Sequence, residues 1–193
     1  MTPEWVAAIA SLATLLVISA TALAALGQVR HMRSGNQIVA TNEFRETIES
    51  EFFRQNSEHV INTLPAILND PSVRGRIAAG TSIVAISELL PVRSLANLFE
   101  TLGAFVKRGM IDRDLACDLW GAITLRAWEA AAPLARNIRL AYGNEAIWEN
   151  FEYLAAASRA FARKHPDGTY PKGMPREEMP EVWPELMNRH DDA

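Results

Sequence analysis

The chain has 193 residues, of which 49% are hydrophobic and 22% charged, and its formal net charge at pH 7 is −4. This length predicts one domain with an appendage, and the charge argues against binding of nucleic acid through a strongly electropositive surface. The single cysteine excludes an internal disulfide and a thiolate zinc cluster. The composition changes along the chain, however, and it divides the sequence into three regions.

The first region is an apolar segment, Trp5 to Val29, that holds ten valine, isoleucine or leucine residues and no charged one. As a helix it would extend about 37 Å, more than the roughly 30 Å of a hydrocarbon core. Its aliphatic side chains favour insertion by about 3 to 6 kcal/mol, and Trp5 stands where an interfacial aromatic residue belongs. We therefore predict a transmembrane anchor over residues 1–33, with residues 5–29 in contact with lipid.

Two other interpretations of this segment stay open. A cleaved signal peptide would begin with a basic region and have a shorter apolar core, whereas this chain begins Met1-Thr2-Pro3-Glu4. A buried helix of a soluble protein would be apolar on all sides only inside a much larger core.

The charges that flank the segment predict its orientation. Arg30 and Arg33 follow the apolar run, whereas Glu4 precedes it. The positive-inside rule then places the amino terminus outside and the rest of the chain in the cytoplasm. We expect a single-pass protein of the bacterial cytoplasmic (inner) membrane, with Trp5, Arg30 and Arg33 at the membrane interface.

The second region begins after Ser34-Gly35-Asn36 with a helical pattern. Phe44, Ile48 and Phe52 recur every four residues, which predicts a helix that buries one stripe. A single glycine costs a helix only about 1 kcal/mol, so residues 30–64 could also continue the membrane helix as a stalk. The sequence leaves this choice open.

Two further helices are predicted before residue 110. Asn69-Asp70-Pro71-Ser72 signals a stop and a restart, so a helix is expected over residues 72–90, with Pro91 at a kink or a boundary. Apolar residues then follow helical spacing up to Lys107-Arg108-Gly109, a typical helix end. Within that helix, Gly103 predicts a close crossing by another helix.

The last two helices of the region follow Asp112, which is a good N-cap. Leu115, Leu119 and Ile123 share one side of the first of them, which is expected to continue past Pro133 to Gly143-Asn144. The second is expected to run from Glu145 to His165. No segment shows sustained strand-like alternation, so we predict an all-α fold, a four- or five-helix cytoplasmic bundle over residues 34–165.

The third region, residues 166–193, is an acidic, proline-rich tail. Residues 165–193 contain five of the ten prolines and have a net charge of −4. Such a composition is typical of extended or disordered chain. Trp183, between Val182 and Pro184, could nevertheless dock on a surface and make the tail a clamp or a recognition segment.

A succession of short motifs resembles a known bacterial family. Leu98-Phe99-Glu100-Thr101-Leu102-Gly103 leads through Arg108-Gly109-Met110-Ile111-Asp112 to Asp118-Leu119-Trp120-Gly121. Ala127-Trp128-Glu129 and Glu149-Asn150-Phe151-Glu152-Tyr153-Leu154 come after them. Over about residues 40–160 this resembles a family of uncharacterised, often membrane-anchored helical proteins, a domain of unknown function. The resemblance implies a single span followed by helices, and it implies no activity or cofactor.

The polar residues with the strongest claim to a site lie in the two last motifs. Trp128, Glu129, Asn150 and Glu152 could form a buried polar site between facing helices. Salt bridges from the acids to Arg126, Arg136 or Arg139 are the favoured alternative.

Other chemistry-bearing residues are better explained as structural. Asp112, Asp114 and Asp118 do not share one helix face, so capping and a solvated surface are favoured over a cation site. Cys117 lies near apolar neighbours and is interpreted as a core residue, and the four histidines show no metal-ligand spacing. We expect no catalytic residue, no cofactor and no metal.

The favoured function is therefore a non-enzymatic, membrane-anchored interaction or scaffold module that binds an unidentified protein partner. The alternative is a small-ligand sensor or an enzyme with a site among Trp128, Glu129, Asn150 and Glu152. A homo-oligomer formed through the span and the stalk is a third possibility, and we expect no nucleic-acid partner.

Overall fold

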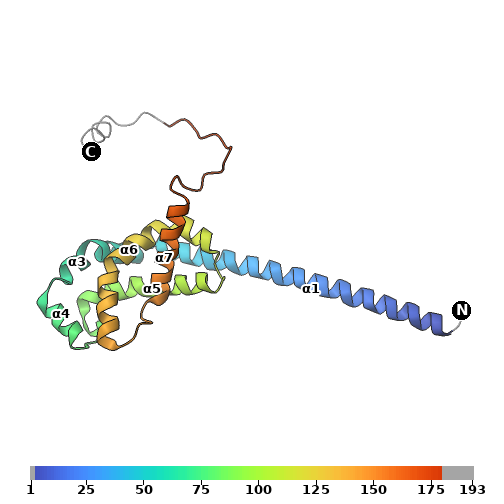
Figure 1. Cartoon of the computed structure of the whole chain (residues 1–193), viewed down its shortest axis with the longest axis horizontal. Coiled ribbons are helices and arrows are strands. Elements are labelled where there is room, and N and C mark those ends of the chain that lie inside the picture. The colour runs from blue at the N-terminus through green and yellow to red at the C-terminus, as the bar shows by residue number, and fades with distance from the viewer. Residues whose placement is uncertain (1–2, 180–193) are drawn as a thin grey trace.

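The computed structural model describes residues 3–179, without the side chains of residues 4–10, 26, 29–34 and 36. Over the described part the fold is all-helical, with seven α-helices and no strand, as the sequence predicts. Six of these helices gather into a bundle, and the first projects from it as a long rod (Figure 1).

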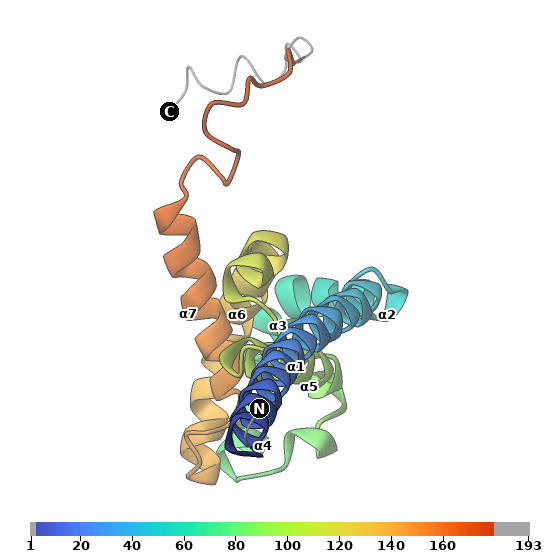
Figure 2. The ribbon, with the colours of Figure 1, turned by 90° about the vertical axis from the view of Figure 1, so that its right-hand side faces the viewer.

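Helix α1, Pro3–Ile48, passes through Ser34-Gly35-Asn36 without a break. The stalk left open by the sequence is therefore continuous with the apolar segment, and it ends at residue 48. A helix of 46 residues is about 69 Å long. Of its side chains, those near the carboxyl end pack on the bundle, among them Ala40, Phe44 and Ile48. Viewed along the rod, the bundle lies behind it (Figure 2).

The chain restarts after α1 at Ser50, whose hydroxyl accepts a hydrogen bond from the N–H of Phe53 at 3.2 Å. This N-cap opens α2, Glu51–Glu58, which is followed by a π-helical turn, His59–Thr63, and by α3, Leu64–Ile67. The break resets the helical phase, so the stripe predicted from Phe44 and Ile48 does not continue to Phe52. Phe52 is 60% exposed and Phe53 is buried in its place.

The prediction of a single helix over residues 72–90 is wrong. Helix α4, Pro71–Ala78, is capped by Asp70 and ends before Gly80, whose φ of +74° leaves the helical region. Two short 3₁₀ turns follow, Ile83–Ala85 and Ser87–Leu89. The hydroxyl of Tyr142 donates to the carbonyl of Thr81 at 2.7 Å and accepts from the N–H of Ile83 at 3.1 Å, which fastens this segment to the bundle.

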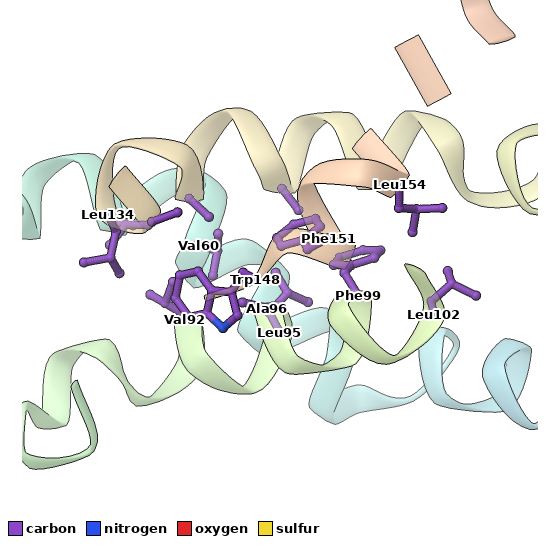
Figure 3. Close-up of a cluster of buried hydrophobic side chains, with 14 of the residues drawn as sticks. Val60, Val92, Leu95, Ala96, Phe99, Leu102, Leu134, Trp148, Phe151 and Leu154 are labelled. Carbon is purple, nitrogen blue, oxygen red and sulfur yellow. The ribbon is translucent and has the colours of Figure 1, made fainter. Parts of the chain in front are cut away.

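The centre of the bundle consists of α5, Leu90–Lys107, α6, Arg113–Tyr142, and α7, Glu149–Lys164. Pro91 lies in the first turn of α5 and marks a boundary, and Asp112 caps α6 by accepting from the N–H of Leu115 at 2.8 Å. The last helix starts at Glu149, four residues later than predicted, because a turn occupies the residues before it. Aromatic and aliphatic side chains of α5, α6 and α7 form much of the core (Figure 3).

Helix α6 turns its small residues to the core rather than the side that carries Leu115 and Leu119. Ala116, Cys117 and Gly121 are buried, whereas Leu115 and Leu119 are exposed. A Cβ on Gly121 would lie 3.4 Å from the Cβ of Ser158 on α7. The small side chains therefore let α6 and α7 approach closely, and the leucines are left on the outside.

One helix among the described residues is long and apolar enough to cross a membrane, judged by length and hydropathy alone. It is Ser87–Lys107, and 44% of its most apolar window is buried in the bundle. Ser11–Ala25 is apolar but shorter than a full span, within the part of α1 whose side chains are described.

The carboxyl-terminal part from Pro166 to Met179 is exposed and contains turns but no helix. The hydroxyl of Thr169 donates to the carboxylate of Asp118 at 2.9 Å, and Arg176 lies over the ring of Tyr170. The predicted docking residue Trp183 lies outside the described residues.

Candidate functional site

The amino end of α7 lies against α5, and a carboxylate of α5 caps it. Glu100 accepts hydrogen bonds from the N–H groups of Asn150 and Phe151, at 3.0 and 2.9 Å, and from the Asn150 side-chain amide at 2.7 Å. The first N–H groups of a helix have no partner within the helix, and a negative charge near them is favourable. Glu100 thus performs the task of an N-cap from another helix.

The backbone before α7 makes this contact possible. Trp148 adopts a left-handed conformation, with φ of 55°, and no side chain of the local chain caps the helix. Its buried indole N–H donates to the side-chain oxygen of Asn97 at 3.3 Å. Burial of a large aromatic ring and this hydrogen bond offset the strain of a positive φ.

Gly103 allows the close crossing that the sequence predicts. A Cβ at this position would lie 2.0 Å from the carbonyl oxygen of Asn150. Lys107, one turn further on α5, donates to the Glu149 carboxylate and to the Asn150 side-chain oxygen, both at 3.3 Å. One face of α5 therefore receives the start of α7 through hydrogen bonds and a close backbone contact.

The predicted residue Glu152 forms an ion pair with Arg139 of α6, 2.7 Å from carboxylate to guanidinium. This is one of the pairings that the sequence favours. The Nε of Arg139 donates to the carbonyl of Ile147 at 2.9 Å, so the same arginine fastens the turn before α7.

The other two predicted residues lie on α6. Trp128 packs its ring edge-on against Phe151, with 5.0 Å between ring centroids, and Phe151 in turn stacks on Phe99. Glu129 pairs with Arg159 of α7 at 3.1 Å, on the exposed surface. Its partner, Arg159, is not one of the three arginines considered from the sequence, all of which lie on α6.

The four predicted residues lie along the contacts of α7 with α5 and with α6, and the structure does not gather them round one cavity. Trp128 and Glu129 line a surface hollow with Arg136 and Arg159. Asn150 is engaged with α5 and Glu152 with Arg139. Sequence reasoning missed Glu100, because nothing local marks a carboxylate that caps a helix fifty residues away.

A larger open groove, of about 850 Å³, lies between α3, α4 and α6. Its lining is mainly apolar and carries three kinds of polar side chain, from Arg74, Glu129 and the asparagines Asn69 and Asn137. It shares Glu129, Pro133, Asn137 and Leu140 with the hollow beside Trp128, so the two adjoin along α6.

The remaining candidates from the sequence have structural surroundings. Cys117 is buried, burial raises the pKa of its thiol, and the hydroxyl of Ser158 lies 3.8 Å from its sulfur. His59 lies 3.2 Å from the carbonyl oxygen of Glu88 through its Nε2. Among the described residues, no group of three or more metal-ligating side chains comes together.

The predicted membrane-interface residues Trp5, Arg30 and Arg33 belong to α1, and the structure describes their backbone but not their side chains.

The comparison with known families covers α1 and most of the bundle. The fold places the chain in the class of all-helical domains. Residues 6–158 match the model of one family of this class, whose function is unknown. The chain belongs to the family described as "Domain of unknown function (DUF4760)". No curated protein and no solved structure matches it.

Proposed function

We propose that the chain is a single-pass membrane protein whose α-helical bundle binds a protein partner on the cytoplasmic side of a bacterial inner membrane. The observation that carries the anchor is the projection of α1 from the bundle (Figure 1). Its leucines are 60 to 70% exposed at residues 12, 15, 16 and 23. Apolar side chains in this number are costly in water, and a bilayer would cover them.

The continuous helix also suits the expected orientation. The apolar run ends at Val29, and among the described apolar side chains of α1 Ala40, eleven residues later, is the earliest that packs on the core of the bundle. This interval corresponds to roughly 16 Å of helix. The bundle would lie close to the surface of the membrane, and Arg30 and Arg33 would lie at the cytoplasmic headgroups.

The partner-binding role is supported by the outer surface of α6. Leu115 and Leu119, one turn apart, are 42% and 54% exposed, although helical spacing suits both for burial. A partner that covers this pair would remove apolar surface from water. The chemistry inferred for the partner is therefore an apolar surface on another protein.

Membrane insertion is tested with the full-length chain in a bacterial host. Alkaline extraction of membranes should leave the wild-type protein in the pellet. Replacement of Leu15 and Leu16 by arginine should release it, because each arginine costs about 3 kcal/mol at the centre of a span. Replacement of the exposed Leu115 and Leu119 by arginine is the matched control and should leave it in the pellet. Release of the wild-type protein would refute the anchor.

The partner is tested by purification of the tagged full-length protein from gently solubilised membranes. A stoichiometric protein that is lost from the Leu115→Glu/Leu119→Glu variant, and kept by the matched Leu140→Glu variant, would support the interaction module. Self-association alone would support the homo-oligomer, and a bound small molecule without protein would support the ligand-sensor alternative. Either result would refute the proposed role.

A further inference from the structure

The groove between α3, α4 and α6 is a surface with an unfilled apolar lining. Leu68, Ile77, Pro133 and Leu134 contribute to it, and Leu140, at its edge, is 69% exposed. Together with the adjoining hollow it extends along α6 past Arg136 to Arg159 of α7. A surface of this kind takes an extended segment with large apolar side chains rather than a single compact side chain.

The charged side chains along the groove indicate the sign of the charge that its occupant carries. The Nε and one terminal nitrogen of Arg74 donate to the carbonyl of Leu68 and to the side-chain oxygen of Asn69, at 2.7 and 3.3 Å. Within the described residues, neither Arg74 nor Arg136 forms an ion pair with a carboxylate. An acidic segment would supply partners to both.

We propose that the groove binds residues 181–187 of the same chain, Glu181-Val182-Trp183-Pro184-Glu185-Leu186-Met187, which lie outside the described residues. This segment combines a tryptophan and three aliphatic or thioether side chains with two carboxylates. Trp183 supplies the large apolar area of an anchor residue. Glu181 and Glu185 supply carboxylates that can form ion pairs with Arg74 and Arg136. The groove is thereby a docking site for an acidic, aromatic peptide, and its occupant is tethered to it.

The tether is long enough for this contact. Thr169 is held at Asp118 on α6, and Leu140 lies about 33 Å further along that helix. From Thr169 to Trp183 the extended chain reaches about 46 Å. Docking requires residues 170–179 to give up the hydrogen bond of Tyr170 to the carbonyl of Pro175 and the contact of Arg176 with the Tyr170 ring. All of these residues up to Met179 are exposed, so the rearrangement sacrifices little buried surface.

Disulfide cross-linking in the full-length protein, held in detergent micelles, tests the contact directly. In a Cys117→Ala background, Leu140→Cys is combined with Pro184→Cys, which leaves Trp183 and both glutamates in place. The matched control combines Leu119→Cys with Pro184→Cys, because Leu119 is also an exposed leucine of α6. Docking raises the effective concentration of the tail at residue 140, so we expect this intrachain disulfide to form about tenfold faster than the control.

Two further changes identify the chemistry of the contact. Trp183→Ala and Arg136→Glu, each added to the 140–184 pair, should slow the disulfide toward the rate of the 119–184 pair. Equal rates for the two pairs, or a product that is a disulfide-linked dimer, would overturn the proposal. The experiment needs no membrane, so its outcome is independent of the anchor.

A second measurement keeps the test valid if the cysteine variants do not fold. Trypsin cleaves after Arg189, two residues beyond the docking segment. Docking should make this cleavage several-fold slower in the otherwise unchanged chain than in Trp183→Ala. Equal cleavage rates would overturn the proposal.

Discussion

Helices α1 and α7 stand at opposite extremes in what surrounds them. Helix α7 is packed on α5 and α6, its first N–H groups are capped by Glu100, and its apolar face is buried at Phe151 and Leu154. The described side chains of α1 between Ser11 and Ala25 are exposed without exception. The stability of the two helices therefore depends on different surroundings. Helix α7 is held by contacts with α5 and α6, whereas the described apolar side chains of α1 between Leu12 and Ala25 are exposed to solvent.

The largest effect that separates the two regions should come from apolar side chains. Phe99 is fully buried and its ring stacks on Phe151 at 4.8 Å. Phe99→Ala should lower the free energy of unfolding of the bundle by about 3 to 5 kcal/mol, because it removes the ring and leaves a cavity. Leu16→Ala, in the exposed part of α1, should change it by less than about 0.5 kcal/mol. Urea unfolding of both variants in micelles, followed by near-UV circular dichroism, measures the difference, and equal losses would show that the two regions unfold as one.

Glycines in two helices sharpen the comparison at the level of the backbone. Gly103→Ala should destabilise the bundle by about 1 to 3 kcal/mol, because the new Cβ would overlap the carbonyl of Asn150. Gly75→Ala in α4 is the matched control, since its Cβ would meet nothing within 4 Å. Alanine is the better helix former by about 1 kcal/mol, so this variant should be neutral or more stable. Thermal unfolding should show a lowered Tm for Gly103→Ala and an unchanged or raised Tm for Gly75→Ala. A Gly103→Ala protein as stable as the wild type would contradict the close α5–α7 contact.

The cap of α7 should contribute more than an exposed ion pair. Glu100→Gln replaces a carboxylate that accepts three hydrogen bonds with an amide, and about 1 to 3 kcal/mol of stability should be lost. Glu129→Gln, which breaks an exposed pair with Arg159, should cost less than about 1 kcal/mol. Amide hydrogen exchange at the start of α7 should accelerate in the first variant only. Unchanged exchange there would show that Glu100 does not cap the helix.

The smallest effect is expected in the segment between α4 and α5, at Glu88. Its own backbone N–H, followed by Arg76 and Ser87, lowers the pKa of this carboxyl from 4.5 to about 2. A lowered pKa contributes stability that is present above pH 4.5 and is lost as the pH falls toward 2. Glu88→Gln should therefore make unfolding slightly less dependent on pH in this range, which acid titration of the wild-type and variant proteins would reveal. A steeper dependence in the variant would contradict the assigned cause.

The sequence predicts the parts of this fold that local rules determine. The caps at Asp70 and Asp112 act within their own helices, and the all-α class follows from helical spacing over the whole chain. The error on α6 has its cause in tertiary packing. Leu115 and Leu119 follow the apolar pattern, yet α6 buries its small residues because α7 approaches them closely.

The candidate site is predicted only in part, for a related reason. Glu152 and Arg139 pair as the sequence favours, and Gly103 admits a close crossing. The role of Glu100 depends on a residue fifty positions later in the chain, and no spacing rule reaches that far. The groove between α3, α4 and α6 depends on the breaks at residues 79–89, which the sequence did not place.

The cap of α7 also orders events in time. All three hydrogen bonds to Glu100 come from a helix that follows it in the sequence, so the acceptor has already been synthesised when the ribosome delivers its donors. Starting a helix is the costly step of its formation, and Glu100 of α5 lowers this cost for α7 by accepting its first N–H groups. A nascent chain that stops within α6 would expose an α5 face with Glu100 and no donors. Completion of α7 is thus the step that closes the bundle.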